Sequence, residues 1–167
     1  WHAGRSFWAG ETDINSRSIG IELDNRGDHP FSNKQMCALI ALCGDIAGRN
    51  NIPAHRVLGH SDVAIGRKTD PGARFDWRRL ALSGVGVWPD LKTWHLNETV
   101  EMDPVMGKDA PRLRAQFVKQ AADYGYDPSL GLEQILSSLR QHFAPHRSGS
   151  LSRFDFALLA ALNALCN

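Results

Sequence analysis

The first regular pattern along the chain is an alternation of apolar and polar side chains over residues 18–23. A period of two residues is typical of a strand that buries one of its faces. The apolar face carries Ile19, Ile21 and Leu23, and Glu22 lies on the opposite face. The pattern therefore predicts a strand that turns Glu22 away from the core.

A helix is predicted next, because apolar residues recur at helical spacing from Asn33 to Ala47. Ser32 is followed three positions later by Gln35, which is the sequence signature of a capping box at a helix N-terminus. Gly48 comes directly after the last apolar position and is expected to end the helix.

Beyond this helix the pattern becomes shorter and less regular. Residues 56–58 predict a short buried strand, and residues 60–75 contain Pro71 and show no period, as in a long functional loop. Trp77 begins a short helix that is interrupted at Gly84. Strand, helix, strand and helix in this order predict an α/β core.

The last third of the chain shows three amphipathic stripes at helical spacing. The first stops at Gly125, the second stops at Pro145, and the third follows a capping box formed by Ser152 and Asp155. Short helices joined by tight turns are typical of a small all-α domain. We therefore expect three helices in this part of the chain.

The change of pattern divides the 167 residues into two predicted domains. Residues 1–90 form the α/β domain, and residues 112–167 form the helical one. Residues 91–111 contain prolines and no clear period, so they are predicted to connect the two domains.

Composition and charge exclude several function classes. The net charge is only +1, so we expect no nucleic-acid partner and no electrostatic attraction to an anionic membrane. No apolar run approaches the roughly 18 residues of a membrane span. Three cysteines are too few for a disulfide framework, and buried free thiols are expected instead. The sequence does not indicate an oligomeric state.

Candidate chemistry is concentrated in the non-periodic loop. His60 and Asp70 offer a nitrogen and an oxygen ligand, ten positions apart, that could converge on one zinc ion. Lys68 could stabilise an oxyanion, and Glu22 could accept a proton from a zinc-bound water. Taken singly, each of these residues is as well explained by a solvated surface position. Together they suggest an acyl-transfer site.

The sequence resembles the type 2 N-acetylmuramoyl-L-alanine amidases, including their AmpD-like and AmiD-like members. The resemblance rests on four blocks in the same order as in the family: residues 1–4 (WHAG), 18–23 (SIGIEL), 59–64 (GHSDVA) and 67–72 (RKTDPG). Residues 75–77 and 84–89 are similar as well. The resemblance implies a mixed central sheet flanked by helices and zinc-dependent hydrolysis of the amide bond between N-acetylmuramic acid and L-alanine in peptidoglycan.

The resemblance also implies a role for each matching residue. His60 and Asp70 match two zinc ligands, Glu22 matches the catalytic glutamate, and Lys68 matches the lysine that stabilises the transition state. The third ligand of the family is a histidine on a strand upstream of the block that begins at Trp1. We therefore expect residues 1–90 to lack the first part of the catalytic domain.

Further residues near the N-terminus are candidates for substrate contact. By its motif position His2 lines the cleft and is not the missing ligand. Aromatic side chains offer flat apolar surfaces for a sugar or a peptide, although Trp8 could equally pack in the core. The full set of substrate-binding candidates is Trp1, His2, Arg5, Trp8, Asn15 and Arg17.

The C-terminal part resembles the three-helix peptidoglycan-binding domain that follows some of these amidases. The similarity covers residues 124–126 and 139–145, and a purely structural cap is the alternative. His142 and His146 are expected to be helix-end residues and not metal ligands. A wall-binding domain favours the periplasm or cell envelope, with a possible outer-membrane anchor upstream, over recycling of wall fragments in the cytoplasm.

Two other functions remain open from sequence. A non-catalytic peptidoglycan recognition module shares the fold, and the missing ligand favours it, whereas the presence of all four matching residues argues against it. A zinc endopeptidase of peptidoglycan is the weaker alternative.

Overall fold

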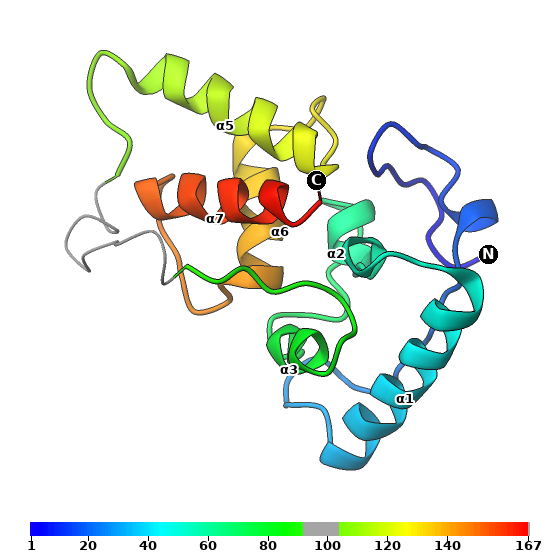
Figure 1. Cartoon of the computed structure of the whole chain (residues 1–167). Coiled ribbons are helices and arrows are strands. Elements are labelled where there is room, and N and C mark those ends of the chain that lie inside the picture. The colour runs from blue at the N-terminus through cyan, green and yellow to red at the C-terminus, as the bar shows by residue number, and fades with distance from the viewer. Residues whose placement is uncertain (92–103, 167) are drawn as a thin grey trace.

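The computed structural model describes residues 1–91 and 104–166. Most of the regular structure in these ranges is helical (Figure 1). The α-helices are α1 (Asn33–Asn50), α2 (His60–Val63), α3 (Trp77–Leu82), α5 (Ala110–Tyr124), α6 (Leu132–Phe143) and α7 (Arg153–Ala164). Two short 3-10 helices, η1 (Asn15–Arg17) and η2 (Ala54–Arg56), complete the set.

The predicted mixed central sheet is wrong for the described residues. Their β-structure consists of two isolated bridges, between Trp8 and Glu11 and between Pro104 and Ser152. Residues 18–23 and 56–58, which were predicted as strands, carry no strand. A strand needs a neighbouring segment to accept and donate its backbone hydrogen bonds, and no described segment pairs with either one.

The apolar alternation of residues 18–23 still has a structural consequence. Ile21 and Leu23 are half-buried against a hydrophobic cluster and Glu22 is exposed, as the pattern predicts, but Ile19 of the predicted apolar face is exposed. Gln35 of α1 helps to fix this segment, because its side-chain amide donates to the carbonyl of Asp24 at 3.0 Å. The segment therefore has a defined position without belonging to a sheet.

Helix α1 begins where the sequence predicts and ends later. The Ser32 hydroxyl accepts a hydrogen bond from the backbone of Gln35 at 3.2 Å, which is one half of the predicted capping box, whereas the Gln35 side chain bonds to Asp24 and not back to Ser32. Gly48 does not end the helix. It continues to Asn50, and Asn51 ends it with a left-handed backbone, φ 52°.

The loop predicted at residues 60–75 contains a short helix. Helix α2 places His60 at its first position, and the Asp62 side chain caps it by accepting from the backbone of Gly59 at 2.8 Å. The remainder of this segment, up to the start of α3 at Trp77, is turns and irregular structure.

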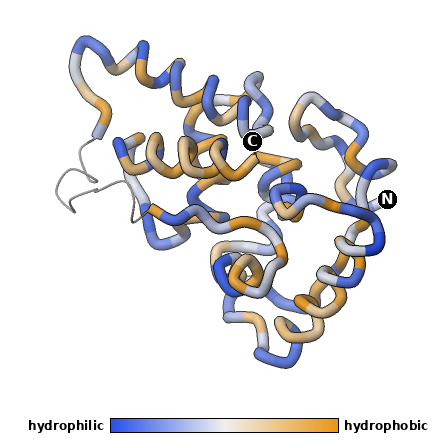
Figure 2. Tube along the Cα trace, in the orientation of Figure 1, coloured by the Kyte–Doolittle hydropathy of each residue, from blue (hydrophilic) through white to orange (hydrophobic). Residues whose placement is uncertain are grey.

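The three predicted C-terminal helices are present as α5, α6 and α7. Helix α5 ends at Gly125, and the capping box of Ser152 and Asp155 opens α7, as predicted. Apolar residues run along nearly the whole of α7 (Figure 2). Helix α5 packs against α6 and α7, and α6 also contacts α2 and α3. The predicted connection at residues 91–111 lies largely outside the described residues.

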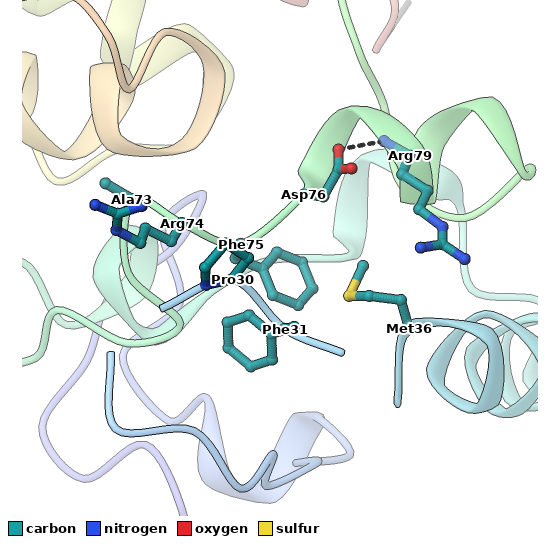
Figure 3. A pocket seen from close by; sticks show the side chains of 8 residues that line it. All are labelled: Pro30, Phe31, Met36, Ala73, Arg74, Phe75, Asp76 and Arg79. Atoms are coloured by element: carbon teal, nitrogen blue, oxygen red, sulfur yellow. Dashed lines mark hydrogen bonds between the residues drawn. The ribbon is translucent and has the colours of Figure 1, made fainter. Parts of the chain in front are cut away.

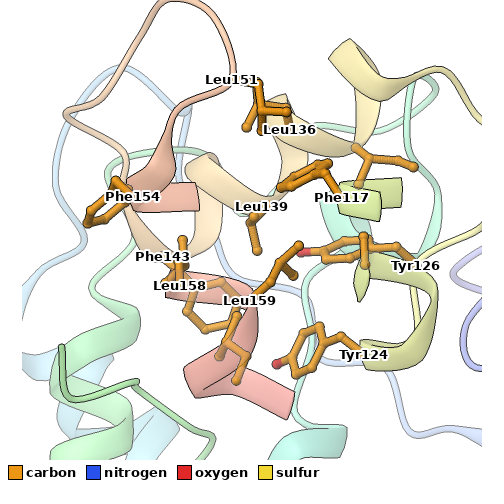
Figure 4. Close-up of a cluster of buried hydrophobic side chains, with 14 of the residues drawn as sticks. Phe117, Tyr124, Tyr126, Leu136, Leu139, Phe143, Leu151, Phe154, Leu158 and Leu159 are labelled. Atoms are coloured by element: carbon orange, nitrogen blue, oxygen red, sulfur yellow. The ribbon is translucent and has the colours of Figure 1, made fainter. Parts of the chain in front are cut away.

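The main hydrophobic cluster joins the two parts of the chain. Figure 4 shows its residues from the C-terminal helices, such as Phe117, Leu139 and Leu158. Trp8 and Val63 pack in the same cluster. The division into domains at residues 1–90 and 112–167 stays a prediction, but the two parts share this buried surface.

A second, smaller cluster lies between α1 and α3 around Met36, Leu39 and Leu80. The three cysteines are free, as expected, but the expectation of burial is wrong for Cys37, which is exposed on α1. Burial raises the pKa of the half-buried Cys43 and Cys166 thiols. No helix in the described part of the chain is long and apolar enough to cross a bilayer.

Candidate functional site

His60 and Asp70 lie side by side. The Nδ1 atom of His60 is hydrogen-bonded to the Oδ2 atom of Asp70. The backbone of Ser61 also donates to the carbonyl of Asp70 at 2.9 Å. This bond joins the two ends of residues 60–70 next to the His60 and Asp70 side chains. The His60 side chain is 15% exposed and that of Asp70 is 57% exposed, so a nitrogen and an oxygen ligand meet at an accessible place.

Lys68 adds a positive charge to this pair. Its Nζ atom lies 3.2 Å from Nδ1 of His60 and donates to the carbonyl of His2 at 2.7 Å. The backbone of Lys68 donates to the carbonyl of Ala64, the residue that follows α2. The chain turns here, which brings the Lys68 ammonium back toward His60. The three residues predicted in this loop are therefore brought together.

His2 connects the loop to the segment that carries Glu22. Its Nδ1 atom lies 3.3 Å from Nε2 of His60, and the two rings stack with centroids 5.6 Å apart. On its other side, Nε2 of His2 lies 3.0 Å from the Ser18 hydroxyl. The ring also lies against the backbone of Gly20, where an added Cβ would come within 2.6 Å of it.

The charges that act on His2 come from the same neighbours. Partial burial lowers the pKa of His2 below its ordinary value, and the charges of His60 and Lys68 lower it further. The negative charge of Glu22 acts in the opposite direction. Glu22 therefore lies within electrostatic range of the cluster, and its exposed carboxylate makes no hydrogen bond to other described residues.

Asn15 and Arg67 fix the backbone around His2. The Asn15 side-chain oxygen accepts from the backbone of His2, Ala3 and Gly4 at 2.8–3.3 Å. The Arg67 guanidinium donates to the carbonyls of Ala3 and Arg5. Asn15, predicted to contact substrate, thus uses its amide to hold the chain. Sequence reasoning did not single out Arg67, although it lies next to Lys68 in the motif.

The remaining substrate-binding candidates have different surroundings. Trp8 is 2% exposed, with its ring edge-on to Tyr124 and Tyr126, so the core alternative is the one observed. Trp1 is 99% exposed. Arg17 is exposed and paired with Glu11, so it is not directed at His60.

Two cavities lie near the segment that carries the cluster. A cavity of about 430 Å³ is lined partly by Arg5, Arg67 and Asp127. Another, of about 320 Å³, has the apolar side chains of Phe31 and Phe75 beside Arg79 (Figure 3). The second cavity contains none of the candidate site residues.

Comparisons with known proteins place the chain among amidases. The Amidase_2 family model, N-acetylmuramoyl-L-alanine amidase, matches residues 1–73. The solved complex of the N-acetylmuramyl-L-alanine amidase AmiD from Escherichia coli with a muropeptide substrate is 36% identical, with a TM-score of 0.85. The match covers 97% of this chain and 67% of the AmiD chain.

The chain belongs to the N-acetylmuramoyl-L-alanine amidase family. A second solved structure, AmpDh3 from Pseudomonas aeruginosa, is 32% identical with a TM-score of 0.81; the match covers 98% of this chain and 68% of that chain. Among curated amidases, AmiD of Escherichia coli is 37% identical over 87% of this chain and AmpD of Enterobacter cloacae is 44% identical over 48%. The chain spans 56% and 43% of these two proteins, about half of their length.

The described residues bring together two side chains of the types that bind zinc. A catalytic zinc takes three protein ligands of the histidine and carboxylate type. His60 and Asp70 fit zinc in the type and convergence of their donor atoms. Within residues 1–91 and 104–166, no group of three or more such side chains is placed to hold a metal ion.

Proposed function

We propose that the protein hydrolyses the amide bond between the lactyl group of N-acetylmuramic acid and the L-alanine of the peptidoglycan stem peptide. The observation that carries the proposal is the cluster of His60, Asp70 and Lys68, which lies against His2 and within range of Glu22. Family membership and the muropeptide bound in the related AmiD structure support the same substrate class.

We further propose that His60 and Asp70 hold a zinc ion together with a third ligand outside the described residues. The family resemblance suggests a histidine upstream of Trp1 for this position. When bound, zinc supplies a Lewis acid that polarises a carbonyl and lowers the pKa of water toward about 7. Both donor atoms lie on one short segment, which favours a fixed geometry.

The chain's own residues supply the acid–base and electrostatic parts of the reaction. Glu22 accepts a proton from the attacking water and returns it to the amine of L-alanine as the carbon–nitrogen bond breaks. The ammonium of Lys68, 3.2 Å from His60, offsets the negative charge that develops on the carbonyl oxygen. His2 keeps the segment of Glu22 against that of His60.

The Glu22→Ala variant tests the acid–base assignment. It should bind zinc as well as the unmodified protein, because Glu22 is not among the proposed ligands. Its kcat on a muropeptide should fall by a factor of about 100 or more. Zinc content is measured by elemental mass spectrometry and turnover by chromatography. Unchanged turnover would sink the assignment.

A non-catalytic peptidoglycan recognition module is the second candidate, and it is favoured by the absence of a third ligand among the described residues. Such a module would bind a muropeptide without cleaving it and would retain well below one zinc per chain after dialysis. An amidase would retain about one zinc and release the stem peptide. A zinc endopeptidase would differ from both the recognition module and the amidase, because it would cleave a bond within the stem peptide.

We also propose that the helices of residues 112–167 bind the cell wall and that the protein acts in the cell envelope, in the periplasm. The support is their resemblance to peptidoglycan-binding domains, since recycling of small fragments in the cytoplasm needs no such domain. Sedimentation of the protein with purified sacculi tests wall binding. Fractionation of cells tests the location.

A further inference from the structure

Helix α6 contacts the segment of the proposed zinc ligands with three side chains. The Ser138 hydroxyl donates to the carbonyl of Ser61 at 2.7 Å, and the Gln141 amide donates to the carbonyl of Thr69 at 2.8 Å. His142 completes the set through Asp62. Positions 138, 141 and 142 share one face of the helix, so a single rigid element makes all three contacts.

These contacts fall directly beside the proposed ligands. Ser61 follows His60 in sequence, and Thr69 precedes Asp70. Fixing both neighbouring carbonyls to α6 fixes the backbone from which the two ligand side chains extend. A zinc site depends on ligands whose orientation is set before the metal binds.

The third contact is a buried hydrogen bond between His142 and Asp62. Nδ1 of His142 donates to Oδ2 of Asp62 at 2.9 Å, and the hydroxyl of Tyr126 donates to Oδ1 at 3.1 Å. Asp62 is 1% exposed and His142 is 3% exposed. A buried carboxylate is costly unless its oxygens accept hydrogen bonds, so these donors hold Asp62, and with it α2, in place.

The surroundings of the pair restrict its movement. The ring of His142 stacks on Trp77, with centroids 3.8 Å apart. Burial and the charge of Asp62 raise the pKa of Tyr126 well above 10, so its hydroxyl keeps its proton and remains a donor. The sequence predicts His142 as a helix-end residue and not a metal ligand, and it lies in the last turn of α6.

We infer that His142 is a positioning residue for the zinc site, which it orients by holding Asp62 and helix α2, with Ser138 and Gln141 holding the neighbouring carbonyls. The inference rests on the proposed function. It gives the C-terminal helices a task at the reaction centre that is separate from wall binding.

Two His142 variants and a control test the inference in the purified protein. His142→Phe keeps an aromatic ring but removes the donor, whereas His142→Asn keeps a nitrogen near the position of Nδ1. Leu158→Ala in α7 is the control, because it removes core packing without removing a hydrogen bond to residues 60–70. The readouts are Zn²⁺ affinity by competition with a chromogenic chelator, kcat and KM on a muropeptide, amide hydrogen exchange of residues 59–70, and the melting temperature.

His142→Phe should weaken Zn²⁺ binding and lower kcat by about 10- to 100-fold, with KM nearly unchanged. Hydrogen exchange at Ser61 and Asp62 should accelerate. His142→Asn should restore most of the Zn²⁺ affinity, of kcat and of the protection from hydrogen exchange. The inference is overturned if His142→Phe matches the unmodified protein, or if Leu158→Ala, at an equal loss of melting temperature, weakens Zn²⁺ binding equally.

A second variant covers the case in which His142→Phe does not fold. Ser138→Ala combined with Gln141→Ala should accelerate exchange and weaken Zn²⁺ binding, and no change in either overturns the inference. Failure of this inference can be distinguished from failure of the proposed function. If the unmodified protein binds Zn²⁺ but does not cleave muropeptide, the proposed function fails, yet Zn²⁺ affinity and hydrogen exchange can still be compared between the variants.

Discussion

His2 depends on a glycine for its position. An ideal Cβ on Gly20 would lie 2.6 Å from Cγ of His2, closer than real Cβ contacts come. Because the same ring stacks on His60, a side chain at position 20 would disturb the contact between the Glu22 segment and the proposed ligands. Glycine at this position is therefore a requirement of the site and not of a turn.

Gly20→Ala should lower kcat/KM by roughly 10- to 100-fold, because a displacement of about 1 Å is enough for losses of that size. Gly48→Ala is the matched control, since nothing lies within 4 Å of its Cβ and alanine favours the helix. Steady-state kinetics on a muropeptide measure both. Equal activity of the two variants would show that His2 is not held in this way.

At the level of single residues, the sequence motifs predict the cluster of site residues but not the residues that hold it in place. His60, Lys68 and Asp70 lie within one short segment, so their resemblance to a family motif is visible in sequence. The partners of that segment are remote. Arg67 reaches carbonyls more than 60 residues away, and His142 lies 80 positions from Asp62. Only the folded chain reveals such pairs.

Among the elements, α6 and α7 are joined by a buried ion pair. Arg140 and Asp155 lie 2.7 Å apart and are 8% and 0% exposed in their side chains. The guanidinium also donates to the carbonyls of Gly149 and Ser150, so it fixes the turn between the helices.

Arg140→Ala should destabilise the fold by about 3–5 kcal/mol, because it leaves Asp155 buried without its partner. Arg153→Ala, an exposed change on α7, should alter stability by no more than about 0.5 kcal/mol. Urea unfolding followed by circular dichroism compares them. A loss below about 1 kcal/mol for Arg140→Ala would contradict the structural role of the pair.

Helices were predictable where their signals are local. Ser32 and Gln35 mark the start of α1, and Ser152 and Asp155 mark that of α7, because a cap involves residues three positions apart. The predicted sheet failed for the opposite reason. Alternation shows which face of residues 18–23 is apolar, but not whether another segment pairs with it.

Across the whole molecule, the main hydrophobic cluster crosses the predicted domain boundary. Trp8 and Val63 are buried with Phe117, Tyr126 and Leu139. Helix α6 lies in this shared core and contacts α2 with its polar side chains. The segment of the proposed ligands and the C-terminal helices therefore depend on each other.

Unfolding should accordingly occur in one transition. Tryptophan fluorescence, to which the buried Trp8 and Trp77 of the two clusters contribute, should change at the same urea concentration as helical circular dichroism. Two separated transitions would show that residues 1–90 and 112–167 are stable independently of the shared core.

The most direct test of the central claim is the identity of the reaction products. The purified, zinc-loaded protein is incubated with a muropeptide of defined structure, and the products are identified by mass spectrometry. We predict an intact stem peptide that begins with L-alanine and a free N-acetylmuramic acid sugar, with the release abolished in Glu22→Ala. Cleavage inside the stem, or an unchanged muropeptide with zinc bound, would contradict the assignment as an amidase.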